Sequence, residues 1–206
     1  MKNKSSSTIK IIEDITNFLK KEQINLSKVS KDGRVNSILN EDEILKLIEK
    51  NYDIEIPRHR AWADFFIDEI PINIKITTTE TADNASSKNG LYYALTGKIY
   101  VGNTSWHSFL KSLKENMAET DNDYYFLIIN KKDSNDVFYN SLKRLNKVQP
   151  NGNNLPFQIK WNENRTPKDR TFEEAKKLLL VGLGKSIKLR ADVYFSFKEY
   201  FNEFIE

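Results

Sequence analysis

The chain has 206 residues, of which 39% are hydrophobic, 12% aromatic and 30% charged, which excludes a disordered or fibrous protein and suffices for one buried core. It contains no cysteine, which excludes disulfide bonds and thiolate zinc sites and leaves oxygen ligands for a hard metal ion such as Mg²⁺. The 32 basic and 29 acidic residues give a net charge of +3. This total charge is weak evidence for a nucleic-acid partner.

Apolar residues in the first fifty positions recur at helical spacing. They predict a first helix from Ile9 to Leu19, after a frayed terminus of seven residues, and a second helix around 41–50. A turn is expected at 31–33, and Asn40 is placed to cap the second helix.

Two strand-like runs, 61–67 and 70–77, are separated by Asp68 and Glu69 and predict a β-hairpin. In the second run isoleucine alternates with other residues, so one face of the strand is apolar and the other is polar. The polar face, which carries Asn73 and Lys75, is therefore the candidate site.

The rest of the chain alternates between strand-like and helix-like patterns. We expect α/β architecture, with a central mixed β-sheet flanked by helices, in one domain over residues 1–206. The loop at 150–154 is a candidate boundary of a small subdomain. The expected strands are 91–95, 98–101, 124–129 and 155–161, and the expected helices are 106–117, 138–145, 172–181 and 192–205.

Asp64 lies in the first strand of the hairpin, where it can join Asn73 and Lys75 of the second strand. A carboxylate at this point can hold a metal ion that polarises a scissile phosphate. A lysine beside it can orient the attacking water and offset the developing negative charge. These are the groups that phosphodiester hydrolysis needs.

The segment from Ala63 to Ile67, followed after a short gap by Asn73 to Thr79, resembles the PD-(D/E)XK nuclease signature. The resemblance is to EcoRV-like type II restriction endonucleases and covers roughly residues 36–100. It implies a restriction-endonuclease-like core and Mg²⁺ as cofactor. It also implies metal binding by Asp64, Asn73 and Ile74, with Lys75 as a catalytic residue.

The chain departs from that signature at two positions. Ala63 stands where the family has proline, and Asn73 stands where the second acidic residue belongs. Asparagine offers a neutral oxygen, so the loss of one negative charge should weaken Mg²⁺ binding. Three explanations are open: another carboxylate compensates, the chain is inactive, or a native acid has been replaced. Glu41, on the side of its helix expected to face the sheet, is the first candidate for compensation.

The stretch 77–90 is dense in small hydrogen-bonding side chains, which is typical of a flexible surface loop or of a segment lying against DNA. We predict DNA contact, with side chains reaching base edges and cations meeting phosphates. The candidate DNA-binding residues are Arg34, Thr77, Thr78, Thr79, Asp83, Asn84, Ser86, Ser87, Lys88, Asn89 and Lys98.

The leading hypothesis is a sequence-specific endonuclease that acts on double-stranded DNA as a homodimer, because two-fold symmetry serves both strands of a symmetric site. A shape-specific repair or junction nuclease of the same fold and a non-catalytic DNA-binding module are the alternatives. The resemblance alone implies a partner DNA methyltransferase. No apolar stretch reaches the about 18 residues of a membrane span, and the start lacks an apolar signal core. We therefore expect a cytoplasmic protein with no membrane partner.

Overall fold

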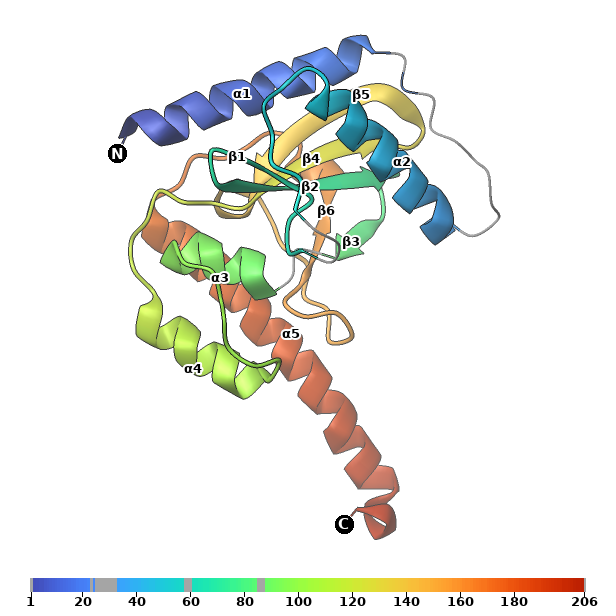
Figure 1. Ribbon diagram of the computed structural model, residues 1–206. Coiled ribbons are helices and arrows are strands. Elements are labelled where there is room, and N and C mark those ends of the chain that lie inside the picture. Colours follow the sequence, from blue (N-terminus) through green and yellow to red (C-terminus); the bar gives the residue numbers. More distant parts are fainter. Residues whose placement is uncertain (1, 23, 25–32, 58–60, 85–87, 206) are drawn as a thin grey trace.

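Four strands form a mixed sheet at the centre of the protein, in the order β1-β2-β4-β5 (Figure 1). β2 and β4 are parallel, whereas the β1-β2 and β4-β5 pairs are antiparallel. The computed structural model describes residues 2–22, 24, 33–57, 61–84 and 88–205, with the backbone alone for 2–8 and 33–39. The strands are β1 (Phe65–Ile67), β2 (Ile70–Thr77), β4 (Tyr125–Asn130) and β5 (Asp133–Ser141).

Helices cover both faces of this sheet. Ile72, Ile74 and Ile76 of β2 pack with the apolar side chains of α1 and α2, while Phe126 and Ile128 of β4 pack with those of α3, α4 and α5. β4 is apolar on both faces because it is covered on both sides. The helices are α1 (Lys2–Lys21), α2 (Gly33–Glu49), α3 (Lys88–Thr96), α4 (Trp106–Asn116) and α5 (Phe172–Tyr200).

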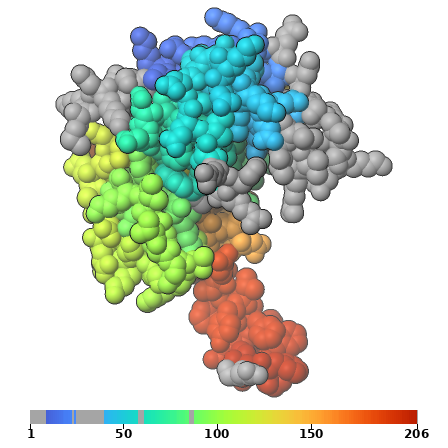
Figure 2. Space-filling view, viewed as in Figure 1, coloured from blue at the N-terminus to red at the C-terminus, as the bar shows by residue number. Residues whose placement is uncertain are grey.

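A second, two-stranded sheet and the end of α5 lie outside this core. β3 (Ala82–Asn84) pairs antiparallel with β6 (Gln158–Lys160). The C-terminal part of α5 projects away from the rest of the molecule (Figures 1 and 2). The described residues also form three short 3₁₀ helices: η1 (Leu142–Arg144), η2 (Trp161–Asn164) and η3 (Asn202–Phe204).

The predicted mixed sheet flanked by helices is confirmed, and so is the hairpin. β1 and β2 are joined by Asp68 and Glu69, whose φ angles of 48° and 70° are those of a type I′ turn. This turn has the right-handed twist that two paired strands require. The first strand is shorter than predicted, because only Phe65 to Ile67 pair with β2.

Two predictions in the N-terminal third need correction. α1 already begins at Lys2, so the first residues are not a frayed terminus. α2 begins at Gly33 and not near residue 41, so Asn40 lies inside the helix, where its side chain is buried and does not cap it. Residues 31 and 32 of the expected turn lie outside the described residues.

The strands predicted at 91–95 and 98–101 are wrong. Residues 88–96 form α3, and Gly90 to Thr96 are all buried. A helix that is buried on every side loses the helical alternation of polar and apolar residues, so it resembles a buried strand in sequence.

The helix predicted at 138–145 is also wrong, because β5 continues to Ser141 and η1 follows it. The strand expected at 155–161 shortens to β6. The two C-terminal helices are the single helix α5, which continues through Gly182 and Gly184. Gly182 is buried against Val148, where a Cβ would lie 2.5 Å from Val148 Cγ2, so this glycine serves close packing and does not end the helix.

We predict that Glu69→Gly raises the free energy of unfolding by about 0.5–1 kcal/mol relative to Glu69→Ala. Glycine adopts the positive φ of this turn without steric cost, whereas alanine retains that cost. Both substitutions remove the same carboxylate, so their difference isolates the backbone. Urea denaturation measures it, and equal stabilities would contradict the assignment of a strained turn.

Candidate active site

The Asp64 carboxylate binds the edge of β2 just beyond the point where β1 stops pairing. The Asp64 N–H donates to the Ile72 carbonyl at 2.9 Å, and this hydrogen bond marks the end of the β1-β2 pairing. The next N–H on this edge, that of Ile74, donates to Asp64 Oδ2 at 2.6 Å. The carboxylate therefore replaces a strand partner at this point of the sheet.

Asn73 contacts the same carboxylate oxygen. Its side-chain Nδ2 donates to Asp64 Oδ2 at 2.8 Å. Its Oδ1 is buried and has no hydrogen-bond partner among the described residues. If the amide were rotated by about 180°, the Asn73 oxygen would face the carboxylate oxygen, and two acceptors cannot hydrogen-bond to each other. The orientation with Nδ2 toward Asp64 is therefore the one that makes the hydrogen bond. Asn73 thus offers an unused buried acceptor beside Asp64.

Glu41 of α2 reaches the same site, as its position in the sequence predicted. Burial and the negative charge of Asp64 raise the pKa of Glu41 to about 7, while the positive charges of Lys75 and Lys131 act in the opposite direction. Such charge effects on a partly buried group require short separations. The tertiary structure therefore places Glu41 within range of the charges of Asp64 and Lys75.

Lys75 balances the two acids. Its side chain is half-buried and lies on the same face of β2 as Asn73, because the two residues are two positions apart in the strand. Burial raises the pKa of Asp64, whereas the hydrogen bond from the Ile74 N–H and the charge of Lys75 lower it. The lysine thus favours the ionised carboxylate that a metal ion would need.

Oxygen atoms suited to Mg²⁺ gather at this edge of β2. They are the Asp64 carboxylate, the buried Asn73 Oδ1 and the Ile74 carbonyl, which lies on the same edge of the strand as the Ile74 N–H. The Glu41 carboxylate is near enough for the charge of Asp64 to act on it. Among the described residues, no group of three or more His, Cys, Asp or Glu side chains could hold a metal. The oxygen atoms at the edge of β2 nevertheless fit Mg²⁺, because this ion takes only one or two carboxylates and completes its octahedron with water and phosphate oxygens.

Two supporting aromatic residues were missed from the sequence. The Tyr124 hydroxyl donates to the Trp62 carbonyl at 2.7 Å, and the two rings stack at 5.7 Å. Tyr124 is buried, and burial followed by the charge of Asp64 raises its pKa. These contacts anchor the chain two residues before Asp64. In the sequence, Tyr124 is only the first residue of a predicted apolar strand. No local pattern therefore indicates its contact with Trp62.

Lys131 was also missed. It directly follows β4, and its N–H donates to the Thr77 carbonyl at the end of β2 at 2.8 Å. Because β2 and β4 are parallel, their carboxyl ends lie at the same edge of the sheet, and this places the positive charge of Lys131 close enough to act on Glu41. The sequence pattern that could have indicated Lys131 is a basic residue directly after a predicted buried strand.

Two of the predicted DNA-contacting residues are buried, and others hydrogen-bond within the protein. Thr77 and Thr79 are buried, whereas Thr78 is partly exposed and hydrogen-bonds to the Thr81 hydroxyl at 3.1 Å. Asp83 accepts from Trp161 Nε1 at 2.8 Å, and Asn84 accepts from Gln158 Nε2 at 3.1 Å. These last two contacts support the β3-β6 pair. Ser86, Ser87 and the side chain of Arg34 lie outside the described residues.

Lys88 and Asn89 lie closer to the hairpin. They line a concavity of about 650 Å³ together with Trp62, which is two residues before Asp64. Lys88 Nζ donates to the Thr104 carbonyl and lies 4.5 Å from the centroid of the Trp106 ring. Lys98 is farther along the chain and donates to Asn116 Oδ1 at 3.1 Å.

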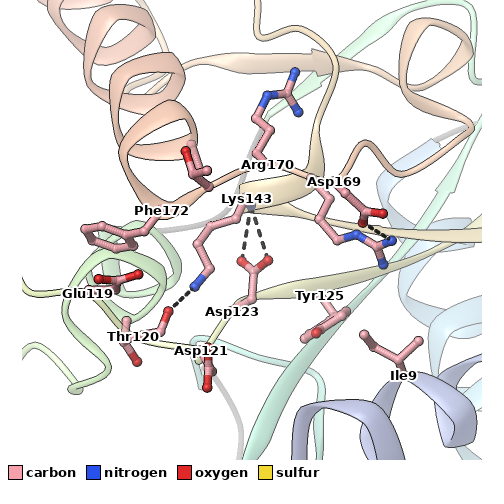
Figure 3. Close-up of a pocket in the computed structure, with 13 residues that line it drawn as sticks. Ile9, Glu119, Thr120, Asp121, Asp123, Tyr125, Lys143, Asp169, Arg170 and Phe172 are labelled. Carbon is pink, nitrogen blue, oxygen red and sulfur yellow. Dashed lines mark hydrogen bonds and ion pairs between the residues drawn. The ribbon is translucent and has the colours of Figure 1, made fainter. Parts of the chain in front are cut away.

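A separate concavity of about 430 Å³ lies between α5 and the sheet and contains several charged side chains (Figure 3). Its buried acid, Asp123, accepts from the main-chain N–H groups of Tyr124 and Lys143 at 2.8 and 3.2 Å. Lys143 Nζ donates to the Thr120 carbonyl at 2.6 Å. These charges are used in holding the loop between α4 and β4, which leaves the hairpin as the stronger candidate site.

No protein-family model matches the chain, and no curated protein or solved structure is significantly similar to it. Among the described residues, no helix is both long enough and apolar enough to cross a membrane.

We predict that Glu41→Gln raises the free energy of unfolding at pH 8, without divalent ions, by about 1–2 kcal/mol, a figure reduced for partial solvent exposure. The folded protein favours protonated Glu41, so folding takes up a proton between pH 4.5 and about 7. Stability in the native chain therefore falls as pH rises through this window.

Denaturant unfolding at pH 5 and pH 8 measures the effect, and Glu43→Gln, at an exposed position of the same helix, is the control. The expected gain appears at pH 8 and not at pH 5, and only for Glu41→Gln. An equal gain at both pH values would place Glu41 away from the acidic site.

Proposed function

We propose that the chain is an Mg²⁺-dependent endonuclease that hydrolyses phosphodiester bonds in double-stranded DNA at specific sequences. The observation that carries this proposal is the bonding of Asp64 to Asn73 and to the Ile74 N–H at the open edge of β2, with the charges of Lys75 and Asp64 acting on Glu41. The resemblance of the hairpin to the PD-(D/E)XK signature agrees with it. A restriction-endonuclease-like core belongs to the same proposal.

Each residue has a separate task in this reaction. Asp64, Asn73 Oδ1 and the Ile74 carbonyl would hold Mg²⁺, which polarises the scissile phosphate when bound. The Lys75 ammonium orients the attacking water and offsets negative charge that develops on the phosphate. The half-buried position of Lys75 strengthens this effect, because fewer water molecules screen its charge.

Glu41 supplies the second negative charge that Asn73 lacks. With a pKa of about 7, its carboxyl is partly ionised at neutral pH, and a bound divalent cation favours the ionised form. Cleavage should therefore increase as pH rises through about 7. This role supports compensation among the three explanations for Asn73.

A non-catalytic DNA-binding module is the second candidate. It is favoured by the hydrogen bond between Asn73 and Asp64, which partly satisfies the carboxylate without a metal ion. Incubation of plasmid DNA with Mg²⁺ tests both candidates. Discrete fragments support the endonuclease, nicking that depends on DNA shape supports a repair or junction nuclease, and binding without cleavage supports the module.

We predict that Lys75→Met lowers the cleavage rate by about 10²–10³-fold while DNA affinity in Ca²⁺ changes little, because the lysine acts mainly on transition-state charge. Plasmid cleavage in Mg²⁺ and fluorescence anisotropy in Ca²⁺ measure the two quantities. Lys46→Met, at an exposed position of α2, is the control and should leave both unchanged. Cleavage by Lys75→Met at the native rate would remove Lys75 from the site.

We predict that Asn73→Asp destabilises the metal-free protein by about 1–3 kcal/mol and that Mg²⁺ restores the loss. The substitution replaces an N–H donor, 2.8 Å from Asp64 Oδ2, with a second carboxylate. Thermal unfolding in EDTA and in Mg²⁺ measures the effect. Asn17→Asp, at an exposed position of α1, is the control and should show no Mg²⁺ dependence.

The cleavage rate of Asn73→Asp separates the open explanations for the native asparagine. An increase by orders of magnitude indicates that Asn73 had inactivated the site, whereas a small change indicates that Glu41 already supplies the acid. In the second case Glu41→Gln should stop cleavage. Loss of stability that Mg²⁺ does not restore would move the metal site away from the hairpin.

A further inference from the structure

The apolar stripe that attaches α5 to the protein continues along the part of the helix that projects into solvent. The buried residues of α5 follow helical spacing, and Ser186 is the last of them. Arg190 then donates to the carbonyls of Gly152 and Asn153 at 2.6 and 3.0 Å. The buried positions of α5 are Ala175, Leu179, Gly182, Leu183 and Ser186.

Beyond Ser186 the same three- and four-residue spacing carries large apolar side chains that remain 46–71% exposed. A helix end surrounded by water normally carries polar residues on such a face. The members of this surface, named the α5 stripe below, are Leu189, Val193, Tyr194, Phe197, Tyr200, Phe201 and Phe204.

The area of the α5 stripe matches what a stable dimer buries. A large aromatic side chain presents about 150–250 Å² when fully exposed. At the observed exposed fractions, the five aromatic and two aliphatic residues present roughly 600–900 Å² in each copy. A standard protein interface buries about 800 Å² per partner. The stripe is thus large enough to hold two copies together without help from other surfaces.

The charge of this segment disfavours DNA and anionic lipid as the covering partner. Residues 189–204, which span the stripe, contain two basic residues, Arg190 and Lys198, against three acidic residues, Asp192, Glu199 and Glu203. A segment with net negative charge repels phosphate groups. An apolar protein surface remains, and a second copy of this chain presents one of equal size.

We propose that the α5 stripe is a homodimer interface in which the stripes of two copies pack against each other about a two-fold axis. Such an isologous contact uses the same patch on both copies and closes at two subunits. The proposal depends on the exposed surface of α5 and not on the chemistry of the hairpin. Cleavage of both DNA strands would need two active sites held as a pair, and this interface would hold them together.

Sedimentation velocity on the full chain tests the interface. The native chain is expected to be a dimer at micromolar concentration, and Phe197→Glu or Tyr200→Glu should raise the dimer dissociation constant at least about 100-fold. Phe195→Glu is the matched control. Phe195 is 61% exposed and lies two residues after Val193, on another side of the helix, where its ring meets the edge of the stripe at Tyr194 with 5.8 Å between the ring centroids.

A monomeric native chain would overturn the proposal, and so would equal effects of the stripe and control substitutions. Circular dichroism of each variant confirms that α5 is retained. If the native chain is a dimer but does not cleave DNA, this interface stands and the proposed nuclease activity is wrong. If the native chain is a monomer and cleaves DNA, the nuclease activity stands and this interface is wrong.

Single cysteines test the contact directly, because the chain contains none of its own. Val193→Cys, Phe197→Cys and Phe204→Cys place thiols along the stripe, and Phe195→Cys is the control. A disulfide forms where the Cα atoms approach within about 4.4–6.8 Å, so oxidation should trap a covalent dimer for at least one stripe position. Trapping at no stripe position, or equal trapping of Phe195→Cys, would contradict the packing of stripe against stripe.

Discussion

The hydrogen bond from the Ile74 N–H to the Asp64 carboxylate is the contact on which the candidate site depends. β1 pairs with β2 only as far as Ile72, so the next N–H on that edge needs another partner. Asp64 supplies it and is thereby held beside Asn73 and the Ile74 carbonyl. One interaction thus ends the hairpin pairing and sets the position of the carboxylate that the proposed chemistry uses.

This arrangement has an energetic cost in the absence of a cation. Burial raises the pKa of both Asp64 and Glu41, and the negative charge of Asp64 further opposes the ionisation of Glu41. Lys75 offsets part of this cost, and a divalent ion would offset more. Functional sites commonly retain such destabilising charges because the chemistry requires them. The same balance explains why stability and cleavage should respond to pH in opposite directions near pH 7.

α5 serves two separate purposes along its length. Its N-terminal half completes the core, where Leu179 and Leu183 pack with the side chains of α3, α4 and β4. Its C-terminal half repeats the apolar spacing, and no neighbour among the residues that the structure describes covers it (Figure 2). Helical periodicity alone cannot distinguish these two halves, because both carry the same pattern.

The sequence by itself determined the hairpin and the core strand beside it. Strict alternation along 70–77 and the apolar run at 124–129 are local patterns, and local patterns depend only on the geometry of a single strand. The same reasoning identified Asp64, Asn73 and Lys75 as neighbours, because a hairpin joins residues that are close in the chain.

Only the tertiary structure decided the remaining members of the site and the surface around it. Glu41 comes from α2, whereas Tyr124 and Lys131 lie at the two ends of β4, and their positions depend on how these elements pack. Packing also converted the aromatic run at 91–95 into the buried helix α3 and buried Thr77 and Thr79. Burial depends on neighbours that are distant in the chain, and a local sequence pattern contains no information about them.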